Sequence, residues 1–439
     1  MALRRGRVDK SVGELSSTDD AALAPQNEGL YDDLPMESHA ANQGTPISKE
    51  VDARIADLVN DVLHRAVELR ASDIHVEPTE TKLSVRIRVD GLLEELIALP
   101  PAQAGPFVSR LKVLARINIV ERRRPQDGQF TVQIAGRAID VRIATVATIY
   151  GEKAVMRLLD TNRTLSNLQH LGMSEKHFQL FSKMVTSQHG LVIATGPTGS
   201  GKTTTLHTAL QEIDFRNLNV STIEDPVEYI VDGINHIPVV EDIGVGFSTQ
   251  LRALLRQDPD VILVGETRDS DTARISVQAA LSGRLVLTSL HATDALSAIY
   301  RLYQMEIEPY LVAASLRGVV SQRLLRKNCS ACAYEYYATE SEKLQIFGKM
   351  TYDLLVLRRG KGCDQCRGTG YHDRVGVYQI LDITEKMREL ISTRPDPTVL
   401  AAAAKSEGMR TLEEEAYQQV LLGNTTVEEV LRLVATDGK

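Results

Sequence analysis

The segment 196–203 constrains this chain most, because it reads Gly-Pro-Thr-Gly-Ser-Gly-Lys-Thr. It fits the phosphate-binding loop pattern of Gly, four residues, Gly-Lys and then Ser or Thr. The apolar run 190–195 before it is typical of a buried parallel strand, and the residues 204–210 after it contain no helix breaker. A strand, a glycine-rich loop and a helix place backbone N–H groups and the positive end of the helix around a phosphate. These flanks disfavour a chance glycine-rich turn and predict a site for ATP or GTP.

The expected roles within this loop follow from its chemistry. Lys202 would reach the β- and γ-phosphates, and the hydroxyl of Thr203 would be a ligand of Mg²⁺. The residues expected around the nucleotide are Gly196, Pro197, Thr198, Gly199, Ser200, Gly201, Lys202, Thr203 and Thr204.

Length and charge narrow the class of protein. A chain of 439 residues is long enough for two or three domains with their own cores. The net charge of −8 argues against wholesale coating of nucleic acid, although it leaves room for a local basic channel. No run approaches the roughly 18 apolar residues of a membrane span, and no apolar region follows the basic residues of the N-terminus as in a signal peptide. We therefore expect a cytosolic protein whose membrane association runs through partners.

The first part of the chain predicts a tail followed by a small domain. Residues 1–49 are polar and mixed with few large apolar groups, and 11–48 contain seven acidic residues and no Lys or Arg, which predicts a disordered tail. From Val51 onward apolar residues recur every three or four positions, as in an amphipathic helix. Alternation over 82–89 and the turn Asp90-Gly91 predict a β-hairpin. With a helix at about 106–119 and further strands, these predict an α+β domain over 50–160, and a linker follows it. The further strands are expected at 130–134, 138–143 and 153–158.

The rest of the chain predicts a nucleotide-binding domain and two smaller regions. Over 161–322 short apolar runs alternate with helical patterns, as in a parallel-sheet domain of the RecA-like kind. Strands are expected at 220–223, 261–264 and 285–288, and helices at 247–256 and 271–281. A tetracysteine insert is expected over 323–374 and a helical region over 375–439. In that last region Thr411 with Glu414, and Thr426 with Glu429, fit capping boxes.

Three candidate catalytic residues follow predicted core strands. Glu266 ends the apolar run 261–264 downstream of the phosphate loop, where an acid supports Mg²⁺ or orients the attacking water. Glu224 ends another predicted strand, and ligands bind outside the carboxyl ends of such strands. The alternative for Glu224 is a solvated acidic turn begun by Asp225-Pro226. His291 follows a third strand and is either a structural histidine or a sensor of the γ-phosphate.

The four cysteines form two Cys-x-x-Cys pairs, Cys329 with Cys332 and Cys363 with Cys366. Two such pairs suit tetrahedral Zn²⁺, and four sulfur ligands make a closed, structural site. The alternative is a set of unrelated thiols, which the absence of any other cysteine disfavours.

Several arginines could contact phosphate oxygens, because a planar guanidinium suits them and their transition-state charge. The candidates are Arg86, Arg88, Arg142, Arg157, Arg252 and Arg256. Sequence alone does not choose among them.

In their order along the chain these blocks resemble the secretion ATPase superfamily that drives type II secretion and type IV pilus assembly. The resemblance runs from about Ala71 to the C-terminus. It depends on the blocks 71–75, 88–91, 124–128, the phosphate loop, an "Asp box" at 222–228, 256–260 with 265–269, a "His box" ending at His291, and the paired cysteines.

The resemblance implies a homohexameric ATPase at the cytoplasmic face of the inner membrane that moves a membrane platform protein. It implies a PAS-like N-terminal domain, with nucleotide bound between that domain and the RecA-like domain. It further implies ATP, Mg²⁺ and Zn²⁺ as the bound groups, and no nucleic acid. By position in the matching blocks, the implied site residues are Lys202 and Thr203 for phosphate and Mg²⁺, Glu266 as the Walker B acid, Glu224 of the Asp box, Arg142 and Arg157 from the N-terminal domain, and Arg252 and Arg256 from the catalytic domain.

The chain departs from the family pattern in two places. Arg284 stands where the family often has histidine, so His291 alone is carried over. The folded region that docks many relatives onto their membrane partner is expected to be absent and replaced by the tail 1–49. The paired cysteines favour the assembly and export branch over retraction motors.

Two other functions compete with this interpretation. A DNA-transfer ATPase of the same superfamily would have a basic surface and hydrolysis stimulated by DNA, which the net charge and the cysteine insert disfavour. A zinc-stabilised scaffold that binds ATP without hydrolysing it is disfavoured because Lys202, Thr203, Glu224 and Glu266 are all present.

Overall fold

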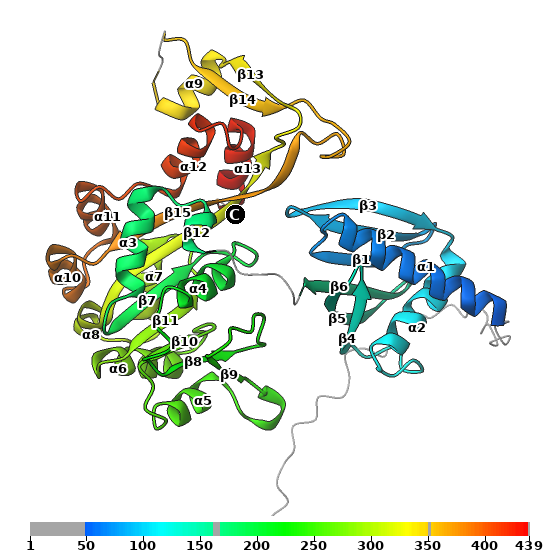
Figure 1. Ribbon diagram of the computed structural model, residues 1–439, viewed down its shortest axis with the longest axis horizontal. Coiled ribbons are helices and arrows are strands. Elements are labelled where there is room, and N and C mark those ends of the chain that lie inside the picture. Colours follow the sequence, from blue (N-terminus) through cyan, green and yellow to red (C-terminus); the bar gives the residue numbers. More distant parts are fainter. Residues whose placement is uncertain (1–48, 161–166, 350–352, 438–439) are drawn as a thin grey trace, which may run out of the picture. The chain divides into compact units, whose positions relative to one another are not determined.

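A computed structural model describes residues 49–160, 167–349 and 353–437 (Figure 1). The predicted tail, apart from Lys49, and the linker residues 161–166 lie outside the described residues. The N-terminal domain and the part of the chain that follows the linker are described separately.

The N-terminal domain is a six-stranded antiparallel sheet with two helices, in the strand order β3-β2-β1-β6-β5-β4. Its elements are α1 (Lys49–Glu68), β1 (Asp73–Pro78), β2 (Leu83–Val89), β3 (Leu92–Leu99), the short 3-10 helix η1 (Pro101–Gln103), α2 (Ala104–Leu114), β4 (Gln126–Ile134), β5 (Arg137–Thr148) and β6 (Gly151–Asp160). The predicted hairpin is confirmed, because β2 pairs with β3 through the turn at Asp90-Gly91.

Period-two alternation explains how this sheet builds its core. In β2, Val85, Ile87 and Val89 point into the core, while the arginines between them are only half-buried. Val59 and Val62 of α1 pack on the same cluster. The second predicted helix ends at Leu114, short of residue 119, because Arg116 has a left-handed backbone with φ 57.

After the linker the chain forms a seven-stranded mixed sheet in the order β15-β12-β7-β11-β10-β8-β9. Neighbouring strands are parallel except β15, which runs antiparallel to β12. The elements before the cysteines are η2 (Leu168–Leu171), α3 (Glu175–Val185), β7 (Gly190–Thr195), α4 (Lys202–Leu210), β8 (Val220–Glu224), β9 (Asn235–Pro238), η3 (Glu241–Ile243), α5 (Phe247–Leu254), β10 (Val261–Val264), α6 (Ser270–Leu281), β11 (Leu285–Leu290), α7 (Ala295–Gln304), α8 (Pro309–Ser315) and β12 (Leu316–Asn328). The α/β class is as predicted, and the antiparallel edge strand is an addition to it.

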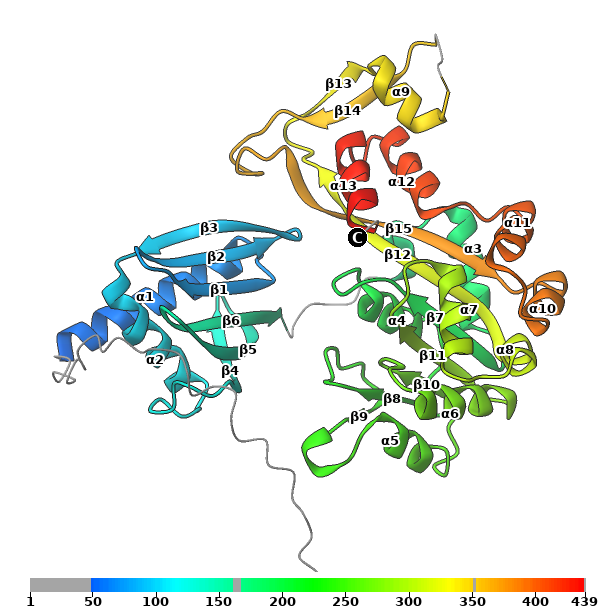
Figure 2. The same cartoon turned by 180° about the vertical axis from the view of Figure 1, so that it is seen from behind.

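Helices cover both faces of this sheet (Figures 1 and 2). Strand β7 is buried throughout and serves both cores: Leu191 and Ile193 belong to one cluster, Val192 and Ala194 to the other. The first cluster includes residues of α5 to α8, and the second includes residues of α3 and α4. A strand buried on both faces reads as a continuous apolar run, which is why its sequence was recognisable.

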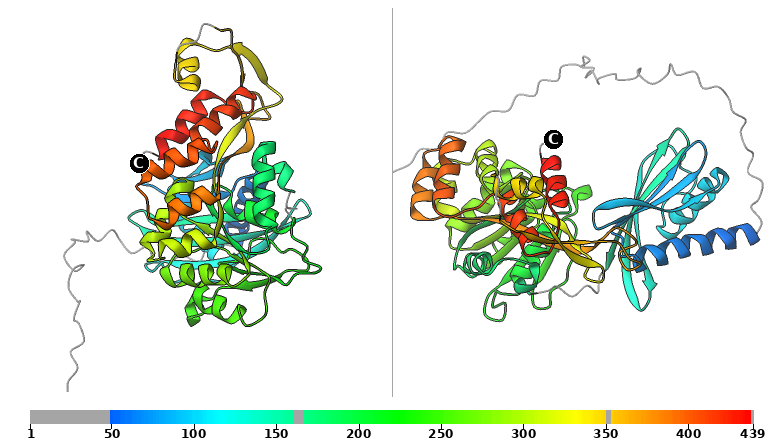
Figure 3. Two further views of the ribbon diagram at one scale, coloured as in Figure 1. Left: turned by 90° about the vertical axis from the view of Figure 1, so that its left-hand side faces the viewer. Right: turned by 90° about the horizontal axis from the view of Figure 1, so that it is seen from above.

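The insert between β12 and β15 is a small hairpin with one helix at the end of these two long strands (Figure 3). It contains β13 (Ala333–Tyr337), α9 (Glu340–Phe347) and β14 (Val356–Gly360). The C-terminal elements are β15 (Tyr371–Asp382), α10 (Glu385–Ser392), α11 (Pro397–Ser406), α12 (Leu412–Leu421) and α13 (Val427–Asp437). The region expected to be helical from 375 thus begins with a strand, whose alternation places Val377 and Tyr378 in different clusters.

The two predicted capping boxes have different outcomes. Thr411 and Glu414 form the complete box at the start of α12. At α13 the Thr426 hydroxyl accepts from the N–H of Glu429 at 3.2 Å. The Glu429 carboxylate, however, binds the guanidinium groups of Arg326 and Arg432. Among the described residues, no helix combines the length and the apolar character that crossing a membrane requires.

Candidate nucleotide and metal sites

The phosphate loop connects β7 to α4 and depends on glycine at two positions. Gly196 has φ 145, and a Cβ there would lie 2.6 Å from the carbonyl oxygen of Gln322. Gly201 has φ 91 and forms the left-handed N-cap of α4. Glycine alone adopts both conformations without strain. The loop therefore leads into a helix whose first N–H groups are available to an anion.

Lys202 curls back over this loop. Its ammonium donates to the carbonyl oxygens of Gly196 at 2.9 Å and Pro197 at 3.1 Å. Burial lowers the pKa of Lys202, while the negative charge of Glu266 opposes that shift. The ammonium is thus held beside the loop and in the field of Glu266.

Strand β12 supports the loop from the side, which the sequence did not reveal. The Gln322 amide donates to the carbonyl oxygen of Ser200 at 2.7 Å. The adjacent Arg323 donates to the carbonyl oxygen of Thr293 at 2.6 Å. Gln322 and Ser200 are 122 positions apart in the chain, and Arg323 and Thr293 are 30 apart. No local sequence pattern could therefore indicate these contacts.

Glu266, Arg268 and His291 meet at the carboxyl ends of β10 and β11. One Glu266 oxygen accepts from Arg268 at 2.5 Å, and the other lies 3.5 Å from Nε2 of His291. Burial alone would raise the pKa of Glu266, but Arg268, His291 and Lys202 outweigh it and lower that pKa. Burial and the Lys202 charge lower the pKa of His291. An ionised carboxylate, a lysine and a histidine therefore converge beside the phosphate loop. Arg268, which contacts Glu266, also belongs to this group, although the sequence analysis did not predict it.

Glu224 ends β8 and is not part of a solvated turn, since only 3% of it is exposed. Its carboxylate accepts from the Thr222 hydroxyl at 2.6 Å and contacts His236 at 3.1 Å and His207 at 3.1 Å. Burial would raise the pKa of Glu224, but the contacts with His207, His236 and Thr222 lower it to about 2. The exposed Asp225 that follows fits the solvated turn better. Sequence reasoning missed both histidines.

The candidate arginines fall into distinct environments. Arg142 of β5 and Arg157 of β6 lie directly opposite each other in the sheet and line a hollow of about 520 Å³ together with Asp73 and Asp127. Like charges placed opposite each other on one face are unfavourable unless an anion lies between them. Asp73 supplies part of this negative charge, because its carboxylate lies 3.2 Å from Nε of Arg157.

The other arginines are differently engaged. Arg86 pairs with Glu77 at 2.6 Å, and Arg88 donates to the carbonyl oxygen of Gly91 at 3.0 Å. Arg252 lies in α5 and Arg256 just after it; both are exposed, and Arg256 donates to the carbonyl oxygen of Arg252.

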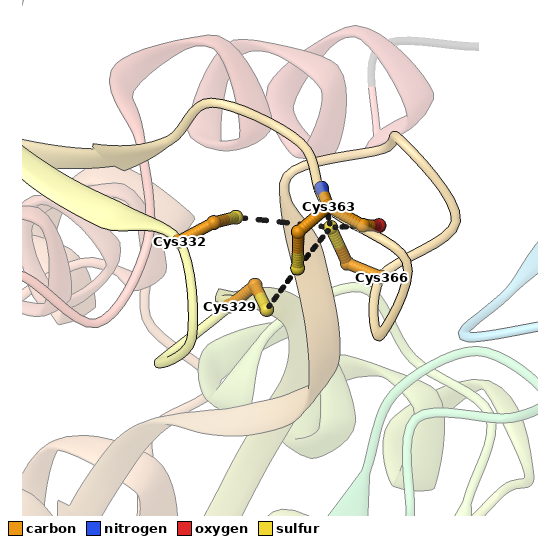
Figure 4. Close-up of side chains that lie close together, drawn as sticks. All are labelled: Cys329, Cys332, Cys363 and Cys366. Carbon is orange, nitrogen blue, oxygen red and sulfur yellow. Dashed lines mark hydrogen bonds between the residues drawn. The ribbon is translucent and has the colours of Figure 1, made fainter.

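The four cysteines come together where β12 ends and β15 begins (Figure 4). Their sulfur atoms lie 3.7 to 3.8 Å apart in three of the pairs, and all lie within 4.8 Å of one another. Four thiolates around Zn²⁺ at about 2.3 Å have sulfur separations of about 3.8 Å, so the arrangement fits that ion. Backbone N–H groups of Cys363 and Gly370 donate to the Cys366 sulfur at 3.1 and 3.3 Å.

Glycines allow the two chain segments beside this cluster to pass closely. A Cβ at Gly360 would lie 2.1 Å from the carbonyl oxygen of Gly370, and a Cβ at Gly370 would lie 2.6 Å from that of Gly360. Any side chain at either position would push the segments that carry the cysteines apart.

Comparison with known proteins decides the family. The family model described as "Type II/IV secretion system protein" matches residues 48–432. The chain belongs to this family. The Type II secretion system protein E of Pseudomonas aeruginosa is 44% identical over 387 residues, which are 88% of this chain and 77% of that protein. The Type II secretion system ATPase E of Vibrio cholerae is 41% identical over 387 residues, covering 88% and 76%.

Solved structures agree with this membership. The pilus retraction motor PilT with bound ADP matches at a TM-score of 0.56 and 25% identity, covering 85% of this chain and 95% of that one. The DotB ATPase of Legionella pneumophila matches at a TM-score of 0.64 and 19% identity, covering 87% and 96%, which shows a shared fold. The predicted resemblance is confirmed. As a member of the type II/IV secretion system family, the chain is a P-loop ATPase of the secretion and pilus motor class.

Proposed function

We propose that this secretion ATPase hydrolyses ATP at the phosphate loop with Glu266 as the Walker B acid. The observation that carries the proposal is the convergence of Lys202, Glu266 and His291 at the carboxyl ends of neighbouring strands. An ionised carboxylate at that place orients the attacking water or supports Mg²⁺, while the lysine and the loop N–H groups bind phosphate. His291, paired with Glu266, would sense the γ-phosphate.

The remaining nucleotide contacts are assigned by chemistry. The Thr203 hydroxyl is the Mg²⁺ ligand, and the loop residues from Gly196 to Thr204 surround the phosphates. Arg142 and Arg157 supply positive charge from the N-terminal domain, since they face each other and line one hollow, although each also pairs with a carboxylate, Arg142 with Asp140 at 3.8 Å and Arg157 with Asp73 at 3.2 Å. Arg252 and Arg256 supply further charge from the catalytic domain. Charge-assisted contacts of this kind would draw the domains together with ATP bound and release them after hydrolysis.

The organisation that we propose has five segments. They are a tail at 1–49, an N-terminal domain of the PAS-like kind at 50–160, a RecA-like domain at 161–322, a zinc-binding insert at 323–374 and a C-terminal region at 375–439. The sheet of the RecA-like domain extends past these bounds, because it takes in all of β12 and β15. The antiparallel six-stranded sheet supports the PAS-like class, and the sulfur separations support Zn²⁺ at Cys329, Cys332, Cys363 and Cys366.

The motor is proposed to work as a homohexamer at the cytoplasmic face of the inner membrane. Its partners would be a membrane platform protein and other subunits of a type II secretion or pilus-assembly machine. The names of the two type II secretion relatives described above support the secretion machine as the setting, and the likeness to PilT supports a pilus-type motor.

The test is the substitution Glu266→Gln, which keeps the size of the side chain and removes its charge. Hydrolysis should fall by about a hundredfold or more while the affinity for ATP stays within a few-fold. Phosphate release and fluorescent-nucleotide binding measure the two quantities. Asp271→Asn, which neutralises an exposed carboxylate on α6, is the matched control and should leave both unchanged. Normal turnover in Glu266→Gln would contradict the proposed role.

A further inference from the structure

A loop with basic and apolar side chains connects α2 to β4 in the N-terminal domain. Its residues 116–124, called the basic loop from here on, include two exposed apolar side chains, because Val120 is 82% exposed and Ile119 44%. The loop also carries four exposed arginines, which are Arg116, Arg122, Arg123 and Arg124. None of the nucleotide contacts assigned above uses these side chains. The loop therefore presents a surface whose purpose the nucleotide site does not explain.

Hydrogen bonds from two side chains fix the shape of the basic loop. The amide of Gln126 accepts from the N–H of Asn118 at 3.0 Å and donates to the carbonyl oxygens of Asn118 at 3.1 Å and Glu121 at 2.9 Å. The ammonium of Lys112, which is fully buried, donates to the same Glu121 carbonyl oxygen at 2.6 Å. The loop thus holds its outward side chains in place before any partner arrives, which lowers the entropic cost of binding.

The positive charge of the basic loop is largely unbalanced. Glu121 is its one acidic residue, and the carboxylate accepts from the backbone N–H groups of Arg123 at 2.7 Å and Arg124 at 3.2 Å. Among the described side chains of the N-terminal domain, no carboxylate oxygen lies within 4.0 Å of a guanidinium nitrogen of the four arginines. A fixed surface with excess positive charge and exposed apolar groups fits an acidic partner that also carries apolar side chains.

The chain itself contains a segment of this composition. Residues 28–37 read Glu-Gly-Leu-Tyr-Asp-Asp-Leu-Pro-Met-Glu, with four acidic residues, four large apolar residues and no Lys or Arg. They belong to the stretch 11–48, which contains seven acidic residues and likewise no Lys or Arg. This stretch lies outside the described residues, so its sequence alone is used. Charge and apolar content in 28–37 are thus complementary to those of the basic loop.

The connection between the two segments is long enough for contact. Twelve positions separate residue 37 from Lys49, where α1 begins, and twelve extended residues span about 40 Å. Helix α1 packs on the same core as α2, which the basic loop follows, and a domain of this size has a radius of gyration of about 13 Å. Attachment to the same domain gives an effective concentration on the order of millimolar, which favours this segment over one in a separate molecule.

We propose that residues 28–37 dock on the basic loop of the same chain. The four carboxylates pair with the arginines, and the apolar side chains between them cover Ile119 and Val120. The docked segment withholds the loop from other acidic partners, such as a second copy of the chain or an anionic lipid surface. Docking of this segment is independent of the function proposed for the nucleotide site.

Photo-cross-linking in the full chain tests the docking. Tyr31 is replaced by the photoreactive p-benzoylphenylalanine, and mass spectrometry identifies the peptides to which the probe attaches. Attachment should fall mainly within 116–124, with a yield about five times or more that of the same probe at Leu23. Leu23 is the matched position, because no acidic residue occurs among 21–27. A mixture of ¹⁵N-labelled and unlabelled protein distinguishes attachment within one chain from attachment between two copies.

The arginine side of the contact is tested with the Tyr31 probe in a triple variant. Arg122→Gln, Arg123→Gln and Arg124→Gln together should reduce the yield within the basic loop about fivefold, because they remove most of its positive charge. Arg137→Gln, at another exposed arginine of the same domain, is the control and should leave the yield unchanged.

The acidic side is tested without altering the folded domain. Asp32→Asn with Asp33→Asn should lower the yield about as much as the arginine variant, whereas Asp19→Asn with Asp20→Asn, a second acidic pair in the same stretch, should not. Salt at about 1 M should lower it as well, because the screening length falls to about 3 Å.

Three results would overturn the proposal. The first is an equal yield from the probes at Tyr31 and Leu23, and the second is attachment only between two copies. The third is the absence of any cross-link to the basic loop while the full chain sediments with phosphatidylglycerol vesicles in a manner that requires Arg122, Arg123 and Arg124. That last result would assign the loop to a membrane surface instead.

Discussion

At the scale of single residues, the phosphate loop is set by backbone conformations that a Cβ would destroy. Gly196 combines a positive φ with a backbone neighbour, the Gln322 carbonyl oxygen, that cannot move aside without shifting β12. Gly201 opens α4 from the left-handed region. The two glycines therefore determine both the conformation of the loop and the direction of the helix that follows it.

We expect Gly196→Ala to lower the affinity for ATP at least tenfold and the free energy of unfolding by about 2 kcal/mol, because φ and contact are both violated. Isothermal titration and urea unfolding measure these effects. Gly246→Ala is the control, since its extended backbone suits alanine and a Cβ there meets nothing within 4 Å. Equal ATP affinity in the two variants would contradict the requirement for glycine at position 196.

Residue patterns predicted the loop, Glu266 and the cysteines because each carries its own context in the neighbouring sequence. They could not predict His207, His236 or Gln322. These side chains act through partners on other elements: both histidines contact Glu224 at the end of β8, and Gln322 donates to Ser200 of the phosphate loop. Nothing in the sequence around His207, four positions after Thr203, indicates that its ring contacts Glu224.

The lowered pKa of Glu224 makes the free energy of unfolding depend on pH. Its pKa falls from the ordinary 4.5 to about 2 on folding, so it stabilises the protein above pH 4.5 and loses that contribution as pH falls toward 2. The linked free energy is at most about 3 kcal/mol. Urea unfolding between pH 6 and 3 should show a steeper decline for the wild type than for Glu224→Gln. Parallel pH profiles would contradict the lowered pKa of Glu224.

At the scale of elements, the C-terminal helix α13 is attached to β12 by a buried charge cluster. Glu429 is fully buried and accepts from the backbone N–H and guanidinium of Arg326 and from Arg432. Arg326 also lies 4.1 Å above the ring of Tyr371. The cluster thus joins α13, β12 and the start of β15.

Glu429→Ala should lower the free energy of unfolding by about 3 to 5 kcal/mol, because it leaves buried guanidinium charge without its partner. Glu428→Ala removes an exposed carboxylate from the same helix and should cost less than about 0.5 kcal/mol. Chemical denaturation compares the two. A small effect of Glu429→Ala would mean that solvent reaches Arg326 in its place.

The cysteine insert should bind one zinc per chain. Cys363→Ser removes one of four ligands, so the zinc content should fall below a tenth of the protein concentration and the β13–β14 hairpin should become protease-sensitive. Ser330→Ala, between Cys329 and Cys332, is the control and should keep the metal. Elemental analysis and limited proteolysis provide the measurements. Zinc retained in Cys363→Ser would place the ion elsewhere.

Element boundaries were the weakest part of the sequence reasoning. The segment boundaries proposed at 322 and 374 cut through β12 and β15, which are continuous strands. Strand β1 was not predicted, although its first three residues, 73–75, belong to a recognised block. In each case the strand is defined by its partner, and the pairing of β12 with both β7 and β15 is not visible in local periodicity.

At the scale of the whole molecule, the hydrophobic cores separate along the chain. The core of the N-terminal domain draws its buried residues from Ile55 to Met156 alone, and the clusters of the second part begin at Leu168. Sequence predicted this division and the α/β class. It could not predict the order of the strands, because that order arises from pairing between segments far apart.

We expect a fragment of residues 49–160 to fold by itself, because its core is self-contained. Circular dichroism should show a cooperative unfolding transition, which Val85→Asp, a buried charge in β2, should abolish. Arg86→Asp, at the neighbouring half-buried position, should retain a transition. A fragment without cooperative unfolding would show that the domain requires the rest of the chain.

The position of the cysteine insert makes it a removable module. Asn328 pairs with Tyr371, so everything between β12 and β15 is topologically the loop of one antiparallel hairpin. Loop closure depends only weakly on loop length, and replacing the module by a short turn leaves every strand of the sheet with its neighbours. Evolution could therefore gain or lose this metal-binding unit in a single insertion or deletion that keeps the strand order of the sheet, provided that the surface of α12 and α13 on which Leu357 packs changes with it.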